Sequence, residues 1–207
     1  MKEYKLTSPV HDDEIRRLKV GDMVFISGKA FTCRSKLQRA VFDEGMVLPE
    51  ELLQYDMLIH TGPIILREKE KYKLVSFMPT SSIRFEKWGA RSVKEWGLKI
   101  IVGKTTMGPQ TANAMREEGC VHLSPRSVSP NLWVSSIRVD GVYLYEEMGS
   151  IEAPWKLFLD ELGPFVVDID ANGNRLFENL NRQVHSRLNQ AYKDLRIPDD
   201  FTYTKLY

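Results

Sequence analysis

Between residues 73 and 123 the sequence alternates short apolar runs with longer amphipathic stretches, and this alternation constrains the fold more than any other feature of the chain. Apolar runs that suit strands lie at 73–77, 98–102 and 120–123, and the stretches between them, 81–96 and 109–118, have apolar residues at helical spacing. Because parallel strands need a crossover connection that is usually a helix, this order predicts an α/β fold with at least a partly parallel sheet.

The pattern changes after Pro125. Further strands are predicted at 139–145, 153–159 and 165–170, and the Asn172-Gly173 pair that follows them is typical of a β-hairpin turn. These segments favour an antiparallel component. The predicted fold class is therefore α/β with a mixed sheet and flanking helices.

The chain ends in a predicted amphipathic helix at about 178–195. Its apolar residues step by three and four positions, and they are Leu180, Val184, Leu188, Ala191 and Leu195. No linker, low-complexity segment or long repeat interrupts the sequence. With 207 residues the chain can bury one sizeable core, so we expect a single domain over residues 1–207.

Charge and hydropathy exclude several classes of protein. The 29 Lys and Arg residues nearly balance the 28 Asp and Glu residues, and the net charge of +1 offers no footprint for a nucleic-acid backbone. No apolar segment approaches the roughly 20 residues of a membrane span. The N-terminal residues 1–5 lack the apolar core of a signal peptide. The sequence therefore predicts a soluble, cytoplasmic protein.

Metal ligands are scarce. The two cysteines, Cys33 and Cys120, cannot alone make a four-thiolate zinc or iron–sulfur site. A disulfide between them is improbable in a reducing cytosol. The four histidines stand far apart in the sequence and show no ligand spacing. Any metal chemistry must therefore come from another chain.

Hydroxyl and basic residues follow the predicted strand at 73–77. Pro79 sets a turn, Thr80 and Ser81 offer hydroxyl groups, and Arg84 lies one helical turn further on. A turn of this kind suits a small carboxylate or phosphate. Helix capping is an alternative explanation for the two hydroxyls, but it does not explain the arginine.

Two more cations follow predicted strands, Lys104 after 98–102 and Arg34 after the run that ends at Gly28. A phosphate-binding loop at Gly103-Lys104-Thr105 is disfavoured, because the preceding residues are themselves a strand and leave no glycine loop. Together with Arg84 these cations could converge on one pocket and hold both carboxylates of a dianion. Three unrelated surface charges remain the alternative.

Asp168 and Asp170 alternate with apolar residues just before Asn172-Gly173. Paired carboxylates can form a catalytic dyad or a metal site. The hairpin explains them better, as residues that flank a turn on the polar side of a strand.

Several motifs spread over about residues 5–180 occur in a fixed order. They are Gly21-Asp22-x-Val24 with Ser27-Gly28 and Arg34, His60-Thr61-Gly62-Pro63, Met78-Pro79-Thr80-Ser81-Ser82-Ile83-Arg84, Ile100-Ile101-Val102-Gly103-Lys104, and Glu152-Ala153-Pro154-Trp155-Lys156 followed by Gly163-Pro164-Phe165 and residues 168–177. In this order they resemble the β subunit of the iron–sulfur-dependent (class I) fumarate hydratases and L-tartrate dehydratases.

The resemblance implies a swivelling β/β/α domain that works with an α subunit. In that family the α subunit holds a [4Fe–4S] cluster, and the β subunit binds the carboxylates of the substrate. By analogy Arg34, Ser81, Arg84 and Lys104 would bind a C4 dicarboxylate, and Thr80 would lie near the transferred proton. The implied reaction is the hydration of fumarate to (S)-malate, in a heterotetramer of two α and two β chains. L-Tartrate dehydration and a non-enzymatic module that binds a small acid are the alternatives.

The sequence departs from the family pattern at five positions and in the stretch 124–130, which lacks the Gly-Gly pair that the family has there. Ser81 replaces a second threonine conservatively. Ser35 and Gln38 stand where the turn after Arg34 usually has an aspartate and a histidine. Met78 replaces a glycine before the proline, and Thr105 replaces a glycine after the lysine. The charged residues match, so the motif still favours a dicarboxylate site while the substrate stays open.

Overall fold

The computed structural model describes residues 1–68, 71–126, 129–198 and 200–202. The chain divides into two compact units, Met1–Arg175 and Leu176–Tyr207. The first unit contains every strand in the described part of the chain. The strands are β1 (Glu3–Thr7), β2 (Met23–Cys33), β3 (Met57–His60), β4 (Ile64–Glu68), β5 (Lys71–Ser76), β6 (Ile100–Val102), β7 (Val121–Pro125), β8 (Ile137–Val142) and β9 (Trp155–Ile169).

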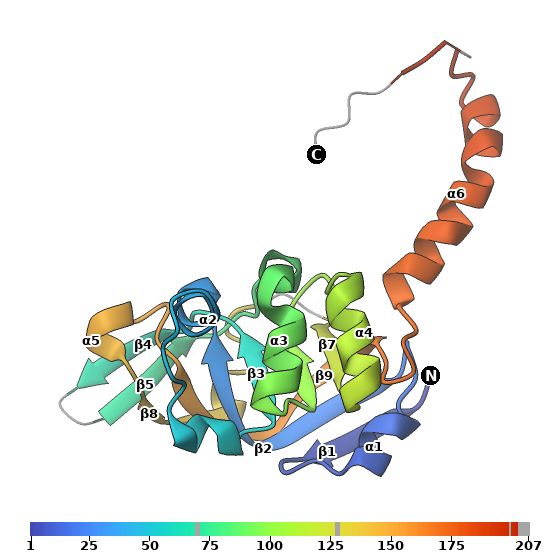
Figure 1. Cartoon of the computed structure of the whole chain (residues 1–207). Helices are drawn as coiled ribbons and strands as arrows, with labels where there is room; N and C mark the ends of the chain where they lie inside the picture. The colour runs from blue at the N-terminus through green and yellow to red at the C-terminus, as the bar shows by residue number, and fades with distance from the viewer. Residues whose placement is uncertain (69–70, 127–128, 199, 203–207) are drawn as a thin grey trace. The chain divides into compact units, whose positions relative to one another are not determined.

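The helices of the first unit lie mostly between these strands in the sequence. They are α1 (Asp12–Arg17), α2 (Ser35–Phe42), α3 (Glu86–Trp96), α4 (Pro109–Glu118) and α5 (Tyr145–Met148), with short 3₁₀ segments η1 (Glu50–Gln54), η2 (Ser82–Phe85) and η3 (Val134–Ser136). Helices α2, α3 and α4 lie side by side and cover one face of the sheet (Figure 1).

The central sheet is mixed and closes into a five-stranded barrel. Strands β2, β3, β6 and β7 are parallel neighbours in that order. Strand β9 runs antiparallel to both β7 and β2 and completes the ring. Strand β1 pairs with β2 outside the barrel, β8 pairs with β9, and β4 and β5 form a separate hairpin. The predicted class, an α/β fold with a mixed sheet and flanking helices, is confirmed.

Two apolar clusters hold this barrel together. Along β6, Ile100 and Val102 belong to the cluster inside the barrel, whereas Ile101 belongs to the cluster beneath the helices. Successive side chains of a strand point to opposite faces, so a strand buried on both faces must be apolar throughout. The apolar runs that predicted strands in the sequence have this cause.

Three details differ from the predicted pattern. The strand expected at 73–77 within the partly parallel sheet is β5, which pairs antiparallel with β4 in a separate hairpin. The strands expected at 153–159 and 165–170 form one continuous strand, β9, whose pairing with β2 shifts register twice. The turn at Asn172-Gly173 exists, with Gly173 at φ +87°, but only the bridge between Ile169 and Arg175 follows it. The hairpin prediction is therefore wrong, because the helical periodicity of the next residues prevails over pairing.

The second unit contains α6, which spans Leu176–Asp194 where the sequence predicts a helix at about 178–195. None of its described side chains is buried. The expectation of a single domain over residues 1–207 stays a prediction. None of the helices in the described part of the chain has the length and apolar character needed to cross a bilayer.

Candidate functional site

The loops that follow β3, β5 and β6 are joined by backbone hydrogen bonds at one edge of the barrel. The amide of Thr80 donates to the carbonyl of His60 at 2.7 Å, and the amide of Lys104 donates to the carbonyl of Thr80 at 3.0 Å. Ser81 pairs with Lys104 in a parallel bridge, and the amide of Ser82 donates to the carbonyl of Lys104 at 2.9 Å. The structure thus brings Thr80, Ser81 and Lys104 together where parallel strands end, the usual ligand edge of such a sheet.

Arg34 reaches the same edge from the end of β2. Its Nη1 lies 2.9 Å from the position that a Cβ would occupy at Gly62, and Ile151 Cγ2 lies 2.5 Å from that position. Only glycine allows so close an approach. Gly62 follows Thr61, which forms a bridge with Pro79 beside Thr80. Arg34 therefore lies next to the loop that carries the two hydroxyls.

The three cations differ in their partners. Arg34 Nε lies 2.9 Å from Glu152 Oε1, and both side chains are about three-quarters buried. Arg84 is exposed and Lys104 is half-buried, and neither forms an ion pair within the residues that the structure describes. The amide of Arg84 donates to the carbonyl of Ser81 at 3.4 Å, so the arginine follows the site loop within one turn. Two cations without an acidic partner are suited to bind a carboxylate.

The helix N-termini near the site already carry carboxylates of the chain itself. Glu86 accepts hydrogen bonds from the amide of Gly108 at 2.6 Å and from the amide of Thr111 at 3.2 Å, at the start of α4. Glu152 accepts one from the amide of Lys36 at 2.9 Å, at the start of α2. A bound anion must therefore use side chains rather than these two helix ends.

Capping does not occupy the site hydroxyls. Ser81 stands at the N-cap of η2 but makes no side-chain capping hydrogen bond. The alternative explanation of Thr80 and Ser81 as helix caps therefore lacks the contact that it requires.

Ser35 and Gln38, the two positions after Arg34 that depart from the family pattern, lie in different environments. Gln38 is fully buried, and its Nε2 donates to Ser92 Oγ of α3 at 3.0 Å. Ser35 is exposed and lines a depression of about 290 Å³ that also includes Glu152. Gln38 thus serves the packing of α2 on α3.

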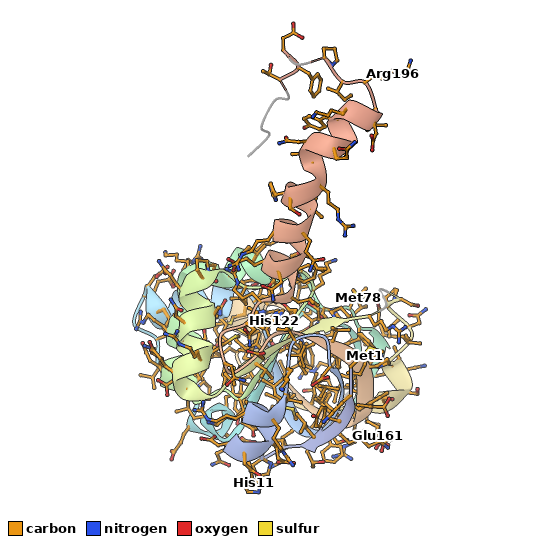
Figure 2. All side chains as sticks on the ribbon, turned by 90° about the vertical axis from the view of Figure 1, so that its right-hand side faces the viewer. Met1, His11, Met78, His122, Glu161 and Arg196 are labelled. Carbon is orange, nitrogen blue, oxygen red and sulfur yellow. The ribbon has the colours of Figure 1, made fainter. Side chains whose placement is uncertain are left out.

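A buried polar cluster lies beneath the site loops, and sequence reasoning missed it. His122 lies in the interior of the first unit (Figure 2). Its Nδ1 lies 2.5 Å from Asp168 Oδ1, and its Nε2 lies 2.8 Å from Ser82 Oγ. His60 Nδ1 lies 2.9 Å from the same hydroxyl. The interpretation of Asp168 as a residue on the polar side of a strand is therefore wrong, because its side chain is fully buried.

The signal for this cluster was present in the sequence. His122 and Asp168 each interrupt an apolar run, in Val121-His122-Leu123 and Val167-Asp168-Ile169. A polar side chain buried within such a run needs a polar partner. Asp170 closes the turn as expected, since its Oδ1 accepts the amide of Asn172 at 3.0 Å.

The residues of this chain do not fit an iron–sulfur cluster. Cys33 and Cys120 are buried, and burial raises the pKa of each thiol, which opposes the thiolate form that metals bind. The described residues contain no group of three or more His, Cys, Asp or Glu side chains that could hold a metal ion.

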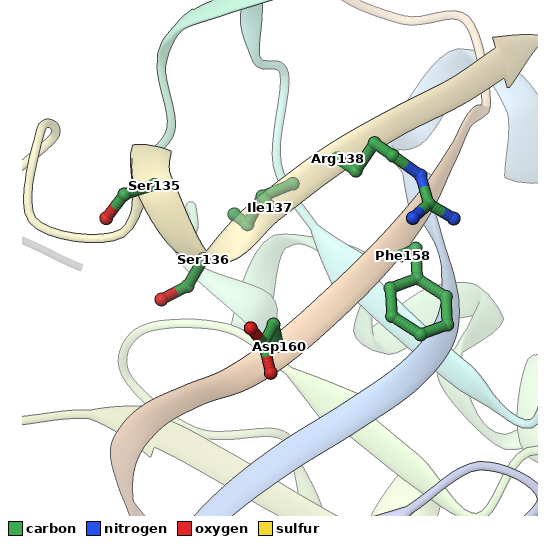
Figure 3. A pocket seen from close by; sticks show the side chains of 6 residues that line it. All are labelled: Ser135, Ser136, Ile137, Arg138, Phe158 and Asp160. Carbon is green, nitrogen blue, oxygen red and sulfur yellow. The ribbon is translucent and has the colours of Figure 1, made fainter.

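A depression of about 360 Å³ lies on the outer side of β8 and β9 (Figure 3). Arg138 stacks over Phe158 there, with its guanidinium carbon 4.6 Å from the ring centre. None of the predicted site residues lines this depression. It is therefore separate from the candidate site.

Comparisons with known proteins agree with the resemblance. The sequence model of the Fumarase C-terminus family matches residues 1–180. The chain is similar to the putative L(+)-tartrate dehydratase subunit beta of Methanocaldococcus jannaschii, with 31% identity over 86% of this chain and 92% of that protein. It is also similar to the L(+)-tartrate dehydratase subunit beta of Escherichia coli, with 29% identity over 83% of this chain and 85% of that protein. A putative class I fumarate hydratase of Geobacillus stearothermophilus is 31% identical over 89% of this chain, which spans 35% of that longer protein.

Proposed function

Because this chain belongs to the Fumarase C-terminus family, whose members include β subunits of class I hydro-lyases, we propose that it is the β subunit of an L-tartrate dehydratase and supplies the carboxylate-binding half of the active site. The sequence alone placed fumarate hydration first and L-tartrate second. The names of the relatives that match over most of their length favour the reverse order.

The observation that carries the proposal is the pair of cations without an acidic partner in the described chain. Arg84 and Lys104 flank the hydroxyls of Thr80 and Ser81 at the ligand edge of the barrel. Each cation binds one carboxylate of the diacid, and an arginine does so with two parallel hydrogen bonds. Arg34, which forms an ion pair with Glu152, binds the diacid at the same edge of the barrel. Thr80 lies next to the carbon that gives up its proton.

The second half of the site belongs to a partner subunit. The longer Geobacillus protein supports this division. This chain spans only 35% of it, so most of that protein lies outside the part that resembles this chain. The resemblance assigns a [4Fe–4S] cluster to the α subunit, where it would activate the leaving hydroxyl. Among the residues that the structure describes, no group of three or more His, Cys, Asp or Glu side chains could hold a metal ion, which is compatible with that assignment.

Fumarate hydration is the second candidate, and the similarity to the Geobacillus protein favours it. L-Tartrate and (S)-malate, the hydrated form of fumarate, differ by one hydroxyl group. A site built to hydrogen-bond a substrate hydroxyl strongly rejects the analogue that lacks it.

The test is an assay of the complex with both substrates. The chain is co-expressed with its cluster-bearing partner, and loss of L-tartrate and of (S)-malate is followed under anaerobic conditions. We expect kcat/KM for L-tartrate to exceed that for malate by at least about 100-fold. A preference for malate would move the assignment to fumarate hydratase, and no turnover of either diacid would contradict the hydro-lyase proposal.

A further inference from the structure

Five buried polar side chains from four elements form one connected cluster beneath the site. His60 ends β3, Ser82 begins η2, His122 and Ser124 belong to β7, and Asp168 belongs to β9. His60, Ser82, His122 and Asp168 are fully buried, and Ser124 is 8% exposed. Asp168 Oδ1 is shared, because it lies 2.5 Å from His122 Nδ1 and 3.1 Å from Ser124 Oγ.

Assigning the protons shows which group donates and which accepts in each hydrogen bond of this cluster. In the His122 tautomer with its proton on Nδ1, this nitrogen donates to the carboxylate of Asp168, and Nε2 accepts from the hydroxyl of Ser82. Ser82 Oγ then accepts from Nδ1 of His60. Nε2 of His60, which has no partner among the described residues, is left as a bare lone pair rather than as a buried donor.

The surroundings of His60 agree with this proton assignment. Its ring centre lies 4.3 Å from that of Phe85, and burial, followed by the neighbouring His122, lowers its pKa well below the usual range. A neutral His60 needs no acceptor at Nε2. A protonated ring would leave an unsatisfied donor in an apolar environment, which is costly.

The cluster contacts the backbone on both sides of Lys104. Ser82 Oγ lies 1.8 Å from the position that a Cβ would occupy at Gly103, so only glycine fits against this hydroxyl. Ser124 Oγ lies 2.7 Å from the carbonyl of Thr105 and 3.1 Å from Asp168 Oδ1, so its single proton can be donated to either acceptor, and the contact with Thr105 is the shorter one. Thr105 has φ +67°, a left-handed conformation that is unfavourable for a residue other than glycine and persists only where its surroundings hold it.

We propose that Asp168, His122 and Ser82 are positioning residues that hold the Gly103–Thr105 turn from below and thereby fix Lys104 for the substrate carboxylate. The role of Lys104 in substrate binding rests on the proposed function. The positioning of the Gly103–Thr105 turn does not rest on the proposed function, because it follows from contacts within this chain.

The same three side chains have the order of a Ser-His-Asp catalytic triad, but a hydrolase is excluded. Ser82 Oγ is fully buried and packs against Gly103, so no substrate can reach it. Its hydroxyl instead contacts His60 and His122, and its oxygen packs against Gly103.

The first test is amide hydrogen exchange in the full chain. The amide of Lys104 donates to Thr80 and that of Ser82 donates to Lys104, so both report on the turn. We expect Ser82→Ala to raise the exchange rates of the Gly103–Thr105 amides by about tenfold or more. Ser92→Ala is the matched control, because Ser92 is also fully buried and bonded to one side chain, Gln38, but lies on α3 outside the cluster. Unchanged exchange in Ser82→Ala, or equal acceleration in the control, overturns the proposal.

The second test needs no substitution. Nitrogen-15 spectra of the imidazole rings are expected to show His60 neutral near neutral pH, with its proton on Nδ1, and to show a proton on Nδ1 of His122. A His122 protonated on Nε2 alone overturns the proposed proton assignment, because Nδ1 could then not donate to Asp168.

The third test separates this inference from the proposed function. In the complex, Ser82→Ala is expected to raise KM for the diacid by about tenfold with a smaller change in kcat. If Lys104→Ala leaves KM unchanged, the proposed role of Lys104 fails, and exchange still decides whether the cluster holds the turn. If Lys104→Ala raises KM while Ser82→Ala alters neither KM nor exchange, the positioning inference fails alone.

Discussion

Glu152 contacts two parts of the candidate site at once. One carboxylate oxygen pairs with Arg34 Nε at 2.9 Å, and the other accepts the amide of Lys36 at 2.9 Å. This double contact sets the direction of the Arg34 guanidinium toward Gly62. In the complex we expect Glu152→Gln, which removes the charge and keeps the shape, to lower kcat/KM by about tenfold through KM.

The exposed pair of Lys5 and Glu161 supplies the control for this change. Both side chains are more than half exposed, so Glu161→Gln removes a charge of the same kind without a positioning role. Equal kinetics in Glu152→Gln and Glu161→Gln would show that Arg34 needs no such support.

His60 makes the stability of the fold depend on pH. Burial lowers its pKa in the folded chain, whereas the unfolded chain takes up a proton at the ordinary value near 6.5. The unfolded state therefore binds more protons as pH falls below about 6.5, and stability declines by up to about 1.4 kcal/mol per pH unit. Urea midpoints measured at neutral and at mildly acidic pH should fall more in the natural chain than in His60→Gln. Parallel pH profiles would contradict this account.

At the level of single residues, the sequence predicted which residues belong to the site but not which side chains contact one another. Thr80, Ser81 and Lys104 were predicted together because the carboxyl ends of parallel strands share an edge. Strand β5 lies outside that sheet, and backbone hydrogen bonds to His60 and Lys104 bring its loop to the edge instead. Glu152 was predicted as part of a motif, but its contact with Arg34 spans more than 100 residues and no local pattern encodes it. The proximity of His122 to Asp168 depends equally on strand order.

Among the elements, α4 depends on a side chain that belongs to α3. Glu86 accepts from the amide of Gly108 at 2.6 Å and from the hydroxyl of Thr111 at 2.7 Å. The carboxylate thus satisfies the first turn of α4 and interacts favourably with its dipole. We expect Glu86→Gln to lower the free energy of unfolding by about 1–2 kcal/mol in a denaturant titration.

Glu117→Gln is the control for this substitution. Its carboxylate pairs with Lys94 across α3 and α4, with both side chains about half exposed, and such pairs contribute about 0–1 kcal/mol. A loss in Glu86→Gln no larger than in Glu117→Gln would mean that the cap is not a stabilising contact.

Helices and strands were predictable from the sequence where the apolar residues follow a single periodicity. Helix α4 begins and ends as expected, since Pro109 opens it and Gly119 closes it in a left-handed conformation. The Asn172-Gly173 pair indicated a second strand, but the turn is closed by Asp170 and helix α6 begins at Leu176. A local turn signal cannot show which element follows the turn.

For the whole molecule, the first unit carries the fold and the candidate site. The family match ends at residue 180, and no described side chain of α6 is buried. We expect a chain that stops at Arg175 to keep the unfolding free energy of the first unit within about 0.5 kcal/mol, measured by urea titration. A loss of several kcal/mol would show that α6 contributes to that unit.

The central claim is that this chain binds the carboxylates while its partner supplies the remaining chemistry. The most direct measurement is kcat/KM for the preferred diacid in the reconstituted complex with Arg84→Ala. Arg138→Ala is the control, because Arg138 is an exposed arginine on β8 away from the site. Removing a cation that pairs with a substrate carboxylate costs roughly 2–5 kcal/mol, so we predict a loss of about 30-fold or more in Arg84→Ala and none in Arg138→Ala. Full activity in Arg84→Ala would contradict the claim.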